Sequence, residues 1–402
     1  MLISHFEGTI DAQYGRASPA VDRGPAPPPR IAVIRQKYRP DGGAERFVGS
    51  LLSVLQPEAY HVTLITRQWN AGTDQSIITC NPPRLGRIVR DWGFSLAVRR
   101  TLERHRFDLI QCAERIAGCD LYRAGDGVHR EWLRQRGRIQ SVAARWLTRI
   151  SPYHVYLKQA EKKLFQSQRL RAVICNSRMV RDEILGHFDV DPAKLRVIYS
   201  GVDLSRFSPE LRRHRPAVRA ELGIPDEAAA FVFVGSGFER KGLKQAIESL
   251  ARLPEGHLIV VGKEKRMAAY RRSVARMGME RRVHLLGVRE EVGPYYGAAD
   301  ALVLPTLYDP FPNVVLEAMA SGLPVVTSTK CGGAELIEPG VNGYVCDALD
   351  RDALAHAMRE LSEREHCRRL GDAARLAVMP YTLDAMRKNL TTLYTELLND
   401  RP

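Results

Sequence analysis

The segment ADALVLPTLYDPFPNVVLEAMASGLPVVTS, residues 299–328, decides the fold. It begins with an apolar run, passes through the proline-rich loop LYDPFP, and continues into the helical pattern NVVLEAMAS. Gly322 then stands where glycine commonly ends a helix, and LPVVTS supplies a second apolar run. A strand, a helix and a second strand in this order predict a βαβ unit with two parallel strands.

The same alternation extends along most of the chain. The apolar runs in AAAFVFVGSG, HLIVVGKE and RVHLLG precede this unit, and an arginine-rich stretch, residues 208–223, separates them from an earlier series: IAVIRQKY, HVTLITR, FDLIQCAE, RAVICNS and LRVIYSG. Short apolar strands at crossover spacing predict two doubly wound, parallel α/β domains with a cleft between them. Ligands of such sheets bind beyond the carboxyl ends of the strands, so the strand-end loops are the candidate sites.

Domain bounds follow from these runs. We expect a disordered leader over residues 1–29, a first domain over 30–205, a second over 206–380, and a C-terminal helix, 381–402, that packs back on the first domain. The apolar runs are too short to span a bilayer, and the leader lacks the apolar core of a signal peptide. Seven cysteines without a CxxC motif indicate neither a disulfide framework nor a zinc site, and they favour a reducing cytoplasm.

The formal net charge of +14 predicts an anionic partner, and much of the excess lies between residues 130 and 169. Apolar side chains such as Trp146 and Leu147 alternate with the basic ones at roughly helical spacing. This pattern is typical of an amphipathic helix on an anionic membrane. The same pattern is equally typical of a helix hairpin that packs its apolar stripe against the protein core and leaves its arginines in water.

The loop SGFERKGLK, residues 236–244, follows the strand FVFVG and carries two adjacent cations, Arg240 and Lys241, at a turn before a helix. It departs from both the P-loop and the GxGxxG patterns. Two cations at a helix N-terminus suit a diphosphate held without a metal. The alternative is a pair of solvated charges on an exposed turn.

Two carboxylates, Asp309 and Glu317, flank the loop and helix of the opening segment. We expect Asn313 to be the N-cap, which leaves the N–H groups of residues 314–316 facing the cleft. Carboxylates accept hydrogen bonds from neutral hydroxyls, which a sugar ring and a ribose supply. Otherwise Asp309 caps a turn and Glu317 lies on a solvated helix face.

Weaker signals complete the set. The glycines of DGG, residues 41–43, permit close approach of a ligand or form a tight turn. Asp189 and Asp191 resemble a metal-binding pair, but their place before Pro192 favours a turn. The absence of HExxH, GxSxG and CxxC leaves a zinc protease, an α/β-hydrolase and a dithiol oxidoreductase unsupported.

These residues resemble a known family. The motifs FVGSGFERKG, RRVHLLGVREEV, YYGAADALVLPTLYDPFPNVVLEAMASGLPVV and GGAELIEPGVNGYV, in order and with matching spacing, are similar to those of the retaining family 4 glycosyltransferases of the GT-B fold. Within that family, YRPDGGAER, GCDLYRAGDGVHREWL and the basic stretch after residue 129 are most similar to the lipopolysaccharide core (heptose) α-1,3-glucosyltransferases. That subgroup has a membrane-interacting segment here, which favours the membrane interpretation of 130–165.

The resemblance assigns roles to individual residues. It implies that Arg240 and Lys241 neutralise the donor diphosphate, that Asp309 contacts sugar hydroxyls, and that Glu317 holds the ribose. The remaining assignments are the backbone of Asn313, Val314 and Val315 on the phosphates or sugar, Gly42 and Gly43 on the diphosphate from the opposite side, and Asp126, with His129 as a second candidate, near the acceptor. The family's usual Glu is Asp309 here, and Pro312 and Asn313 replace its common Gly and neighbour, which leaves the identity of the sugar open.

The implied activity is metal-independent transfer of a hexose, glucose in the first instance, from a UDP-sugar to a lipopolysaccharide core or related lipid-linked glycan. The implied place is the cytoplasmic face of the inner membrane, with no cofactor and no nucleic-acid partner. One alternative is a transferase of the same fold that uses UDP-GlcNAc or UDP-galactose for another cell-envelope glycan. A more remote one is a non-enzymatic membrane or nucleic-acid binding protein that uses the positive charge alone.

Overall fold

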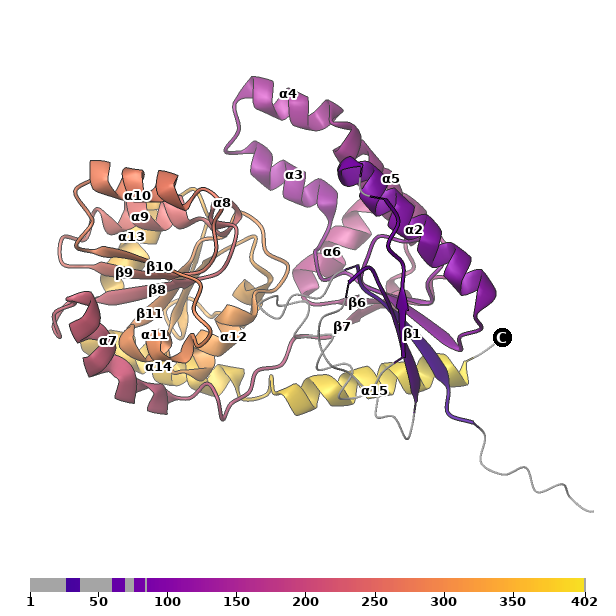
Figure 1. Ribbon diagram of the computed structural model, residues 1–402. Coiled ribbons are helices and arrows are strands. Elements are labelled where there is room, and N and C mark those ends of the chain that lie inside the picture. The colour runs from indigo at the N-terminus through magenta and orange to yellow at the C-terminus, as the bar shows by residue number, and fades with distance from the viewer. Residues whose placement is uncertain (1–26, 37–59, 69–75, 84, 401–402) are drawn as a thin grey trace, which may run out of the picture.

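The structure is a computed structural model that describes residues 27–36, 60–68, 76–83 and 85–400 (Figure 1). Within these residues the strands form two sheets, and all strand pairs in both sheets are parallel. The prediction of two doubly wound α/β units is therefore confirmed. Most of the predicted leader lies outside the described residues.

The first sheet has seven strands in the order β3-β2-β1-β4-β5-β6-β7. They are β1 (Arg30–Ile34), β2 (His61–Thr66), β3 (Ser76–Thr79), β4 (Leu109–Cys112), β5 (Leu121–Arg123), β6 (Ala172–Cys175) and β7 (Leu195–Val197). Sequence patterns missed β3, which is a mostly exposed edge strand, and β5, which is three residues long and includes Arg123. The strand order reverses between β1 and β4, which is where a doubly wound sheet opens its ligand crevice.

The second sheet has six strands in the order β10-β9-β8-β11-β12-β13. They are β8 (Ala230–Val234), β9 (His257–Val261), β10 (Val283–Gly287), β11 (Ala301–Leu304), β12 (Val325–Ser328) and β13 (Gly343–Cys346). Both β8 and β11 are buried along their whole length, as expected for strands covered by helices on two faces. The reversal point lies between them, so the loops after β8 and β11 open toward the same crevice.

Helices cover both sheets (Figure 1). Those of the first half are α2 (Gly86–Arg104), α3 (His129–Gly137), α4 (Val142–Ile150), α5 (Pro152–Phe165) and α6 (Arg178–His187), with the 3₁₀ turn η1 (Pro192–Lys194). Those of the second half are η2 (Pro209–His214), α7 (Arg215–Leu222), α8 (Phe238–Lys241), α9 (Leu243–Leu250), α10 (Met267–Arg276), α11 (Gly293–Ala298), α12 (Asn313–Ala320), η3 (Gly332–Leu336), α13 (Arg351–Glu360) and α14 (Arg364–Val378).

The last helix, α15 (Leu383–Asn399), lies against the first sheet rather than the second (Figure 1). Leu390 and Tyr394 are fully buried in one cluster with Ile31 of β1 and Leu109 of β4. The Tyr394 hydroxyl also donates a hydrogen bond to the Gln111 side chain. The C-terminal segment thus completes the core of the N-terminal half.

The basic segment forms the helices α3, α4 and α5, which project beside the second half of the chain (Figure 1). Helix α5 buries Leu164 and Phe165 in the core of the first sheet. Helix α4 buries none of its residues, and Trp146 and Leu147 are 60% and 59% exposed. The interpretation in which the whole segment packs its apolar stripe inward is therefore wrong for α4. None of the helices in the described part of the chain is long and apolar enough to span a membrane.

We predict that Leu390→Ala lowers the free energy of unfolding by about 2–5 kcal/mol, because it leaves a cavity between α15 and the sheet. Thr391→Ala, a neighbouring substitution at an exposed position of the same helix, should change it by less than about 0.5 kcal/mol. Urea denaturation followed by circular dichroism measures both. Equal stabilities of the two variants would contradict the assignment of α15 to this core.

Candidate functional site

A cleft of about 1360 Å³ lies between the two halves. Both halves contribute to its walls through loops that follow strands, as the doubly wound topology predicts. Its basic lining side chains are Arg87, Arg115, Arg123, Arg136, Arg206, Arg240, Lys241 and Arg289, and its acidic ones are Asp126, Glu290 and Asp309. The excess of positive charge suits an anionic ligand.

Arg240 and Lys241 lie in α8, a single helical turn between β8 and α9. The sequence placed them on a turn, and this is wrong: the turn is Gly242, whose φ of +78° ends α8 and begins α9. A Cβ at Gly242 would lie 1.9 Å from the carbonyl oxygen of Pro305, so a glycine is required where α8 approaches the loop after β11.

The two cations share one carboxylate. Asp309 Oδ2 lies 2.6 Å from Lys241 Nζ and 2.7 Å from Arg240 NH1. Burial alone would raise the pKa of Asp309, but the charges of Lys241 and Arg240 outweigh it and lower the pKa, so the carboxylate is ionised at neutral pH. Because one carboxylate faces two cations, the cluster retains a net positive charge in the cleft.

The three members differ in exposure. The side chains of Lys241 and Asp309 are 9% and 8% exposed, whereas that of Arg240 is 36% exposed. Arg240 also donates to the Tyr308 carbonyl at 3.0 Å. Arg240 is therefore the member of the cluster that a ligand in the cleft reaches most easily.

Helix α12 begins beside this cluster. Its N-cap is Pro312 rather than the predicted Asn313, which is the first helical residue. The Val315 N–H already donates to the Pro312 carbonyl, and Val315 is fully buried, so Asn313 and Val314 are the residues of this end that line the cleft. Of the predicted free donors, residues 314–316, only Val314 lines the cleft, and the helix starts one residue earlier than expected because Pro312, with its extended ψ of 121°, is the N-cap.

Glu317 lies one turn further along α12 and is 3% exposed. Its carboxylate accepts a hydrogen bond from the Tyr296 hydroxyl at 2.9 Å. The alternative that placed Glu317 on a solvated face is wrong, since the residues around it on α12 are buried as well. Glu317 is not among the side chains that line the cleft wall.

Asp126 faces the cluster from the first half of the chain. It lies in the loop after β5, and its side chain is 58% exposed to the cleft. Arg115 NH1 lies 3.8 Å from the carboxylate. Loss of water would raise the pKa of Asp126, but Arg115 and the other arginines around it, Arg35, Arg123 and Arg240, lower it overall. Asp126 is thus a charged, accessible acceptor of hydrogen bonds.

His129 begins α3 directly after this loop. Its Nε2 lies 3.0 Å from Nδ1 of His154 on α5, and its backbone N–H donates to Glu161. Burial, with the charge of Arg115, lowers the pKa of His129 to about 3. The imidazole is therefore neutral at physiological pH, able to accept or donate one hydrogen bond without carrying charge.

Tyr308 connects the two candidate loops. Its hydroxyl donates to Glu183 at 2.7 Å and accepts from the Val128 N–H at 2.9 Å. The Tyr308 side chain is buried, and a Cβ at Gly127, whose φ is +66°, would lie 2.2 Å from its hydroxyl oxygen. The residue next to Asp309 therefore holds the loop that carries Asp126.

Lys330, in the loop after β12, strengthens this connection. Its Nζ lies 2.9 Å from Glu183 Oε1 and 3.2 Å from Glu131 Oε1, both of which belong to the first half. The two carboxylates hold the pKa of Lys330 above its ordinary value despite partial burial. The two halves are therefore joined by the charged hydrogen bonds of Lys330 and by the hydrogen bonds of the Tyr308 hydroxyl.

Other predicted residues lie elsewhere. Gly42 and Gly43 fall outside the described residues. Asp191 accepts the Ala193 N–H and caps the turn η1, which confirms the turn interpretation. In the described ranges no group of three or more His, Cys, Asp and Glu side chains is arranged to hold a metal ion.

Sequence reasoning missed Arg115 and Tyr308. Arg115 follows β4 by three residues, so the rule that strand-end loops face the cleft could have identified it. Tyr308 directly precedes Asp309 and had no signal of its own, because a tyrosine beside an apolar strand is ordinarily a core residue.

Comparisons with known proteins agree with this architecture. The family model Glycosyltransferase Family 4 matches residues 41–206, and the model Glycosyl transferases group 1 matches residues 214–377. The lipopolysaccharide glucosyltransferase WaaG of Escherichia coli is 25% identical over 369 residues, which covers 87% of this chain and 96% of WaaG. A D-inositol 3-phosphate glycosyltransferase of Corynebacterium glutamicum is 28% identical over 59% of this chain and 60% of its own length.

Solved structures share the fold. A crystal structure of WaaG superposes with a TM-score of 0.78 at 23% identity and covers 91% of this chain and 99% of its own. HepE of Anabaena in complex with UDP-glucose superposes with a TM-score of 0.69 at 19% identity, over 92% of this chain and all of HepE.

We predict that Tyr308→Phe lowers the free energy of unfolding by about 1–3 kcal/mol, because it leaves the Val128 N–H and the Glu183 carboxylate without their shared partner. Hydrogen exchange at the Val128 amide should accelerate. Tyr295→Phe is the matched control, since its hydroxyl has no hydrogen bond among the described residues. Unchanged exchange at Val128 would show that the hydroxyl does not hold this loop.

His129 predicts an acid-sensitive stability. Its pKa in the folded protein, about 3, lies below the ordinary value of 6.5. Between these pH values the unfolded chain therefore binds a proton at His129 that the folded chain does not bind. Stability is therefore lost as pH falls from 6.5 toward 3, by up to about 1.4 kcal/mol per pH unit from this group. His129→Gln should lose less stability over that range than wild type, whereas His356→Gln, at a position 65% exposed, should follow wild type. Parallel pH profiles for His129→Gln and wild type would refute the assignment.

Proposed function

Because the chain belongs to the family 4 glycosyltransferases of the GT-B fold, we propose that it transfers a hexose, glucose by preference, from a UDP-sugar to a lipopolysaccharide core or related lipid-linked glycan with retention of configuration. The observation that carries the proposal is the cluster of Arg240, Lys241 and Asp309 beside the start of α12, in the cleft. Relatives named for lipopolysaccharide glucosyl transfer, and a neighbour with UDP-glucose bound, support it.

The donor diphosphate would occupy the space between α8 and α12. Arg240 is exposed enough to meet it, and Asn313 and Val314, at the positive end of the α12 dipole, line the same cleft. Lys241 sits behind Arg240 and keeps the cluster positive. These groups would hold a diphosphate without a metal ion.

In the reaction, the bond from the anomeric carbon to the phosphate oxygen breaks, and negative charge grows on the departing diphosphate. Arg240, Lys241 and the α12 amides are placed to stabilise that charge. Donors fixed before the reaction commonly contribute about 3–4 kcal/mol each in a site that excludes water. The acceptor oxygen would form its new bond on the face that the phosphate leaves, and its proton would pass to a phosphate oxygen of the UDP product.

The two carboxylates of the 309–317 segment take different roles in this proposal. Asp309 has one oxygen on both cations, which leaves its other oxygen to accept a hydrogen bond from a sugar hydroxyl. Glu317 would take the ribose by exchanging the Tyr296 hydroxyl for a ribose hydroxyl. Tyr296→Phe is therefore compatible with donor binding, whereas loss of the Glu317 carboxylate is not.

Asp126 and His129 would serve the acceptor. Asp126 is charged, exposed and on the opposite wall from the cations, and it can orient an acceptor hydroxyl. His129 is neutral and held by His154, so it can share that hydrogen bond without adding charge. The tie from Tyr308 to Val128 would set the distance between this acceptor loop and the donor cluster.

The proposal includes a place of action at the cytoplasmic face of the inner membrane. Helix α4 exposes apolar side chains, among them Trp146 and Leu147, within a basic segment, an arrangement suited to an anionic lipid surface. All seven cysteines are free thiols, as a reducing compartment would keep them.

The relatives named D-inositol 3-phosphate glycosyltransferase favour a second candidate, a small phosphorylated acceptor. Both candidates use a nucleotide-sugar donor, so they share the cluster and differ in the acceptor. Incubation with UDP-glucose and either inositol 3-phosphate or a lipopolysaccharide core oligosaccharide separates them, because transfer to one acceptor excludes the other as the preferred substrate.

We predict that the pure protein slowly hydrolyses one of UDP-glucose, UDP-galactose and UDP-GlcNAc in preference to the others, measured as UDP release. Lys241→Gln should reduce this rate about 100-fold or more with little change in folding, since the departing charge loses its compensation. Lys244→Gln, an exposed lysine paired with Glu248 nearby, is the matched control. Full activity in an Arg240→Ala/Lys241→Ala variant would refute the diphosphate assignment.

A further inference from the structure

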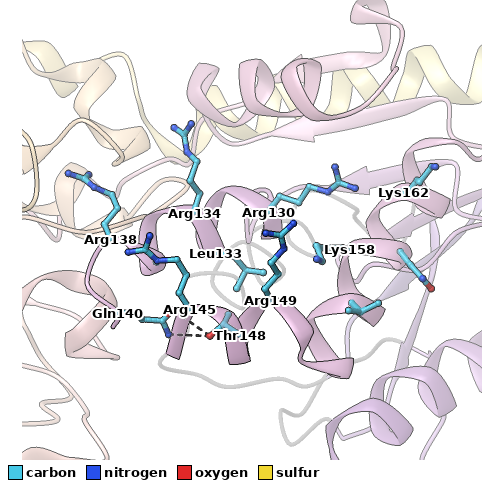
Figure 2. A pocket seen from close by; sticks show the side chains of 13 residues that line it. Arg130, Leu133, Arg134, Arg138, Gln140, Arg145, Thr148, Arg149, Lys158 and Lys162 are labelled. Atoms are coloured by element: carbon cyan, nitrogen blue, oxygen red, sulfur yellow. Dashed lines mark hydrogen bonds between the residues drawn. The ribbon is translucent and has the colours of Figure 1, made fainter. Parts of the chain in front are cut away.

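A second cavity, of about 820 Å³, lies outside the cleft among α3, α4 and α5 (Figure 2). Arg134 and Arg138 stand at one side of it and Lys162 at the other, with Arg149 and Lys158 between them (Figure 2). We refer to this cavity as the cationic pocket. Its lining residues are Arg130, Leu133, Arg134, Gly137, Arg138, Gln140, Arg145, Thr148, Arg149, Val155, Lys158, Gln159 and Lys162, and none of them is acidic.

Most of these cations have no opposing charge. Arg134 pairs with Glu131 at 3.1 Å, and Arg138 pairs with Asp347 at 2.8 Å. In the described part of the chain, no acidic side chain lies within 4.0 Å of Arg145, Arg149, Lys158 or Lys162. Charges of one sign that converge on a cavity from three helices repel one another, and a bound anion would relieve that repulsion.

The pocket is built rather than a chance gathering of solvated side chains. Gln140, in the turn before α4, forms hydrogen bonds with Thr148 on α4, which fixes the α3–α4 turn against the pocket wall (Figure 2). Leu133 and Val155 supply apolar surface between the cations. Pockets of about 300–1000 Å³ accommodate a whole small ligand, so the volume suits a sugar with its charged substituents rather than a single ion.

Two helices separate the cationic pocket from the cleft. Different faces of α3 and α5 line the two cavities, so these two helices form the wall between them. The residues on the cleft side are His129, Trp132 and Arg136 of α3 and Tyr153, His154 and Leu157 of α5. A group bound in the pocket would therefore lie within a short oligosaccharide's reach of the acceptor side of the cleft.

We propose that the cationic pocket binds phosphate or carboxylate groups on the acceptor glycan, at a sugar near the one that is glycosylated, and so positions the accepting hydroxyl toward Asp126. This inference rests on the proposed function, since it assumes that the cleft transfers a sugar to a glycan. The guanidinium groups supply paired donors for phosphate and carboxylate oxygens, and the two lysines supply point charges. The occupant is the acceptor glycan rather than a phospholipid headgroup, because the walls of the pocket are the helices that also line the acceptor side of the cleft.

The test compares two double variants of equal charge change. Arg149→Gln/Lys158→Gln removes two unopposed cations of the pocket, and Arg104→Gln/Lys163→Gln removes two exposed cations of the same half outside it. The acceptor is a deacylated, water-soluble core oligosaccharide, either with its phosphates and carboxylates intact or with the phosphates removed and the carboxylates reduced. UDP-sugar hydrolysis without acceptor is measured in parallel and reports on the cleft alone.

We predict that Arg149→Gln/Lys158→Gln raises KM for the intact oligosaccharide about tenfold or more, as expected for the loss of charge-assisted hydrogen bonds. Hydrolysis without acceptor should be unchanged, and on the neutralised oligosaccharide the variant and wild type should have equal KM. The control variant should match wild type throughout. A pocket variant with the KM of the control on the intact oligosaccharide would overturn the proposal.

Further measurements distinguish the sources of failure. Co-sedimentation with vesicles of phosphatidylcholine and 30 mol% phosphatidylglycerol tests the headgroup alternative: loss of vesicle binding with an unchanged KM for the soluble oligosaccharide assigns the pocket to lipid and refutes the acceptor role. If wild type turns over none of the donors, the proposed function fails. Calorimetric titration of the intact oligosaccharide then decides the pocket separately, since binding that wild type and the control share and the pocket variant lacks would still support it, and equal binding would refute it.

Discussion

The cleft depends on one buried carboxylate. Asp309 lies 2.6 Å from Lys241 and 2.7 Å from Arg240, and the three side chains come from α8 and from the loop after β11, on either side of the reversal point of the second sheet. Without Asp309, Lys241 would be a nearly buried charge without a counterion, which is strongly unfavourable. Without the cations, Asp309 would be the unpaired charge. This side of the cleft is therefore assembled without a ligand, and separating these charges would be costly.

The dipeptide of Tyr308 and Asp309 connects the two walls of the cleft. Tyr308 contacts the first half, whereas Asp309 contacts the second. A movement of one half relative to the other would therefore displace Tyr308, the residue next to Asp309. The two chain segments that connect the halves lie next to each other. The Val202 N–H donates to the Tyr381 carbonyl, and a Cβ at Gly201 would lie 2.5 Å from the Thr382 carbonyl oxygen. The two halves are thus joined by adjacent chain crossings and by a polar tie, with the cleft between.

The alternation of apolar runs was sufficient to predict both sheets and the loops that face the cleft, because parallel buried strands must be apolar on both faces and must end at one edge. It was insufficient where a decision depended on tertiary contacts. The N-cap moved from Asn313 to Pro312, Arg240 and Lys241 proved to lie in a helical turn, and β5 is three residues long with a buried arginine. Glu317 and Tyr308 are side chains whose environments come from elements distant in sequence, and no local pattern contains that information.

The positive charge is concentrated in particular regions of the protein. The net charge of +14 is not spread evenly: arginines and lysines outnumber carboxylates around the cleft and the cationic pocket, and they flank the exposed apolar face of α4. A field of one sign over one region attracts a polyanion and also orients it, and the attraction weakens as salt screens it. Helices α3 and α5 each present one face to the cleft and another to the cationic pocket. A change in how these helices lie on a membrane would therefore move the walls of both cavities together. Under the proposals above, α3 and α5 connect the pocket to the acceptor loop, which would allow the protein to select an acceptor by its charge as well as by its hydroxyl groups.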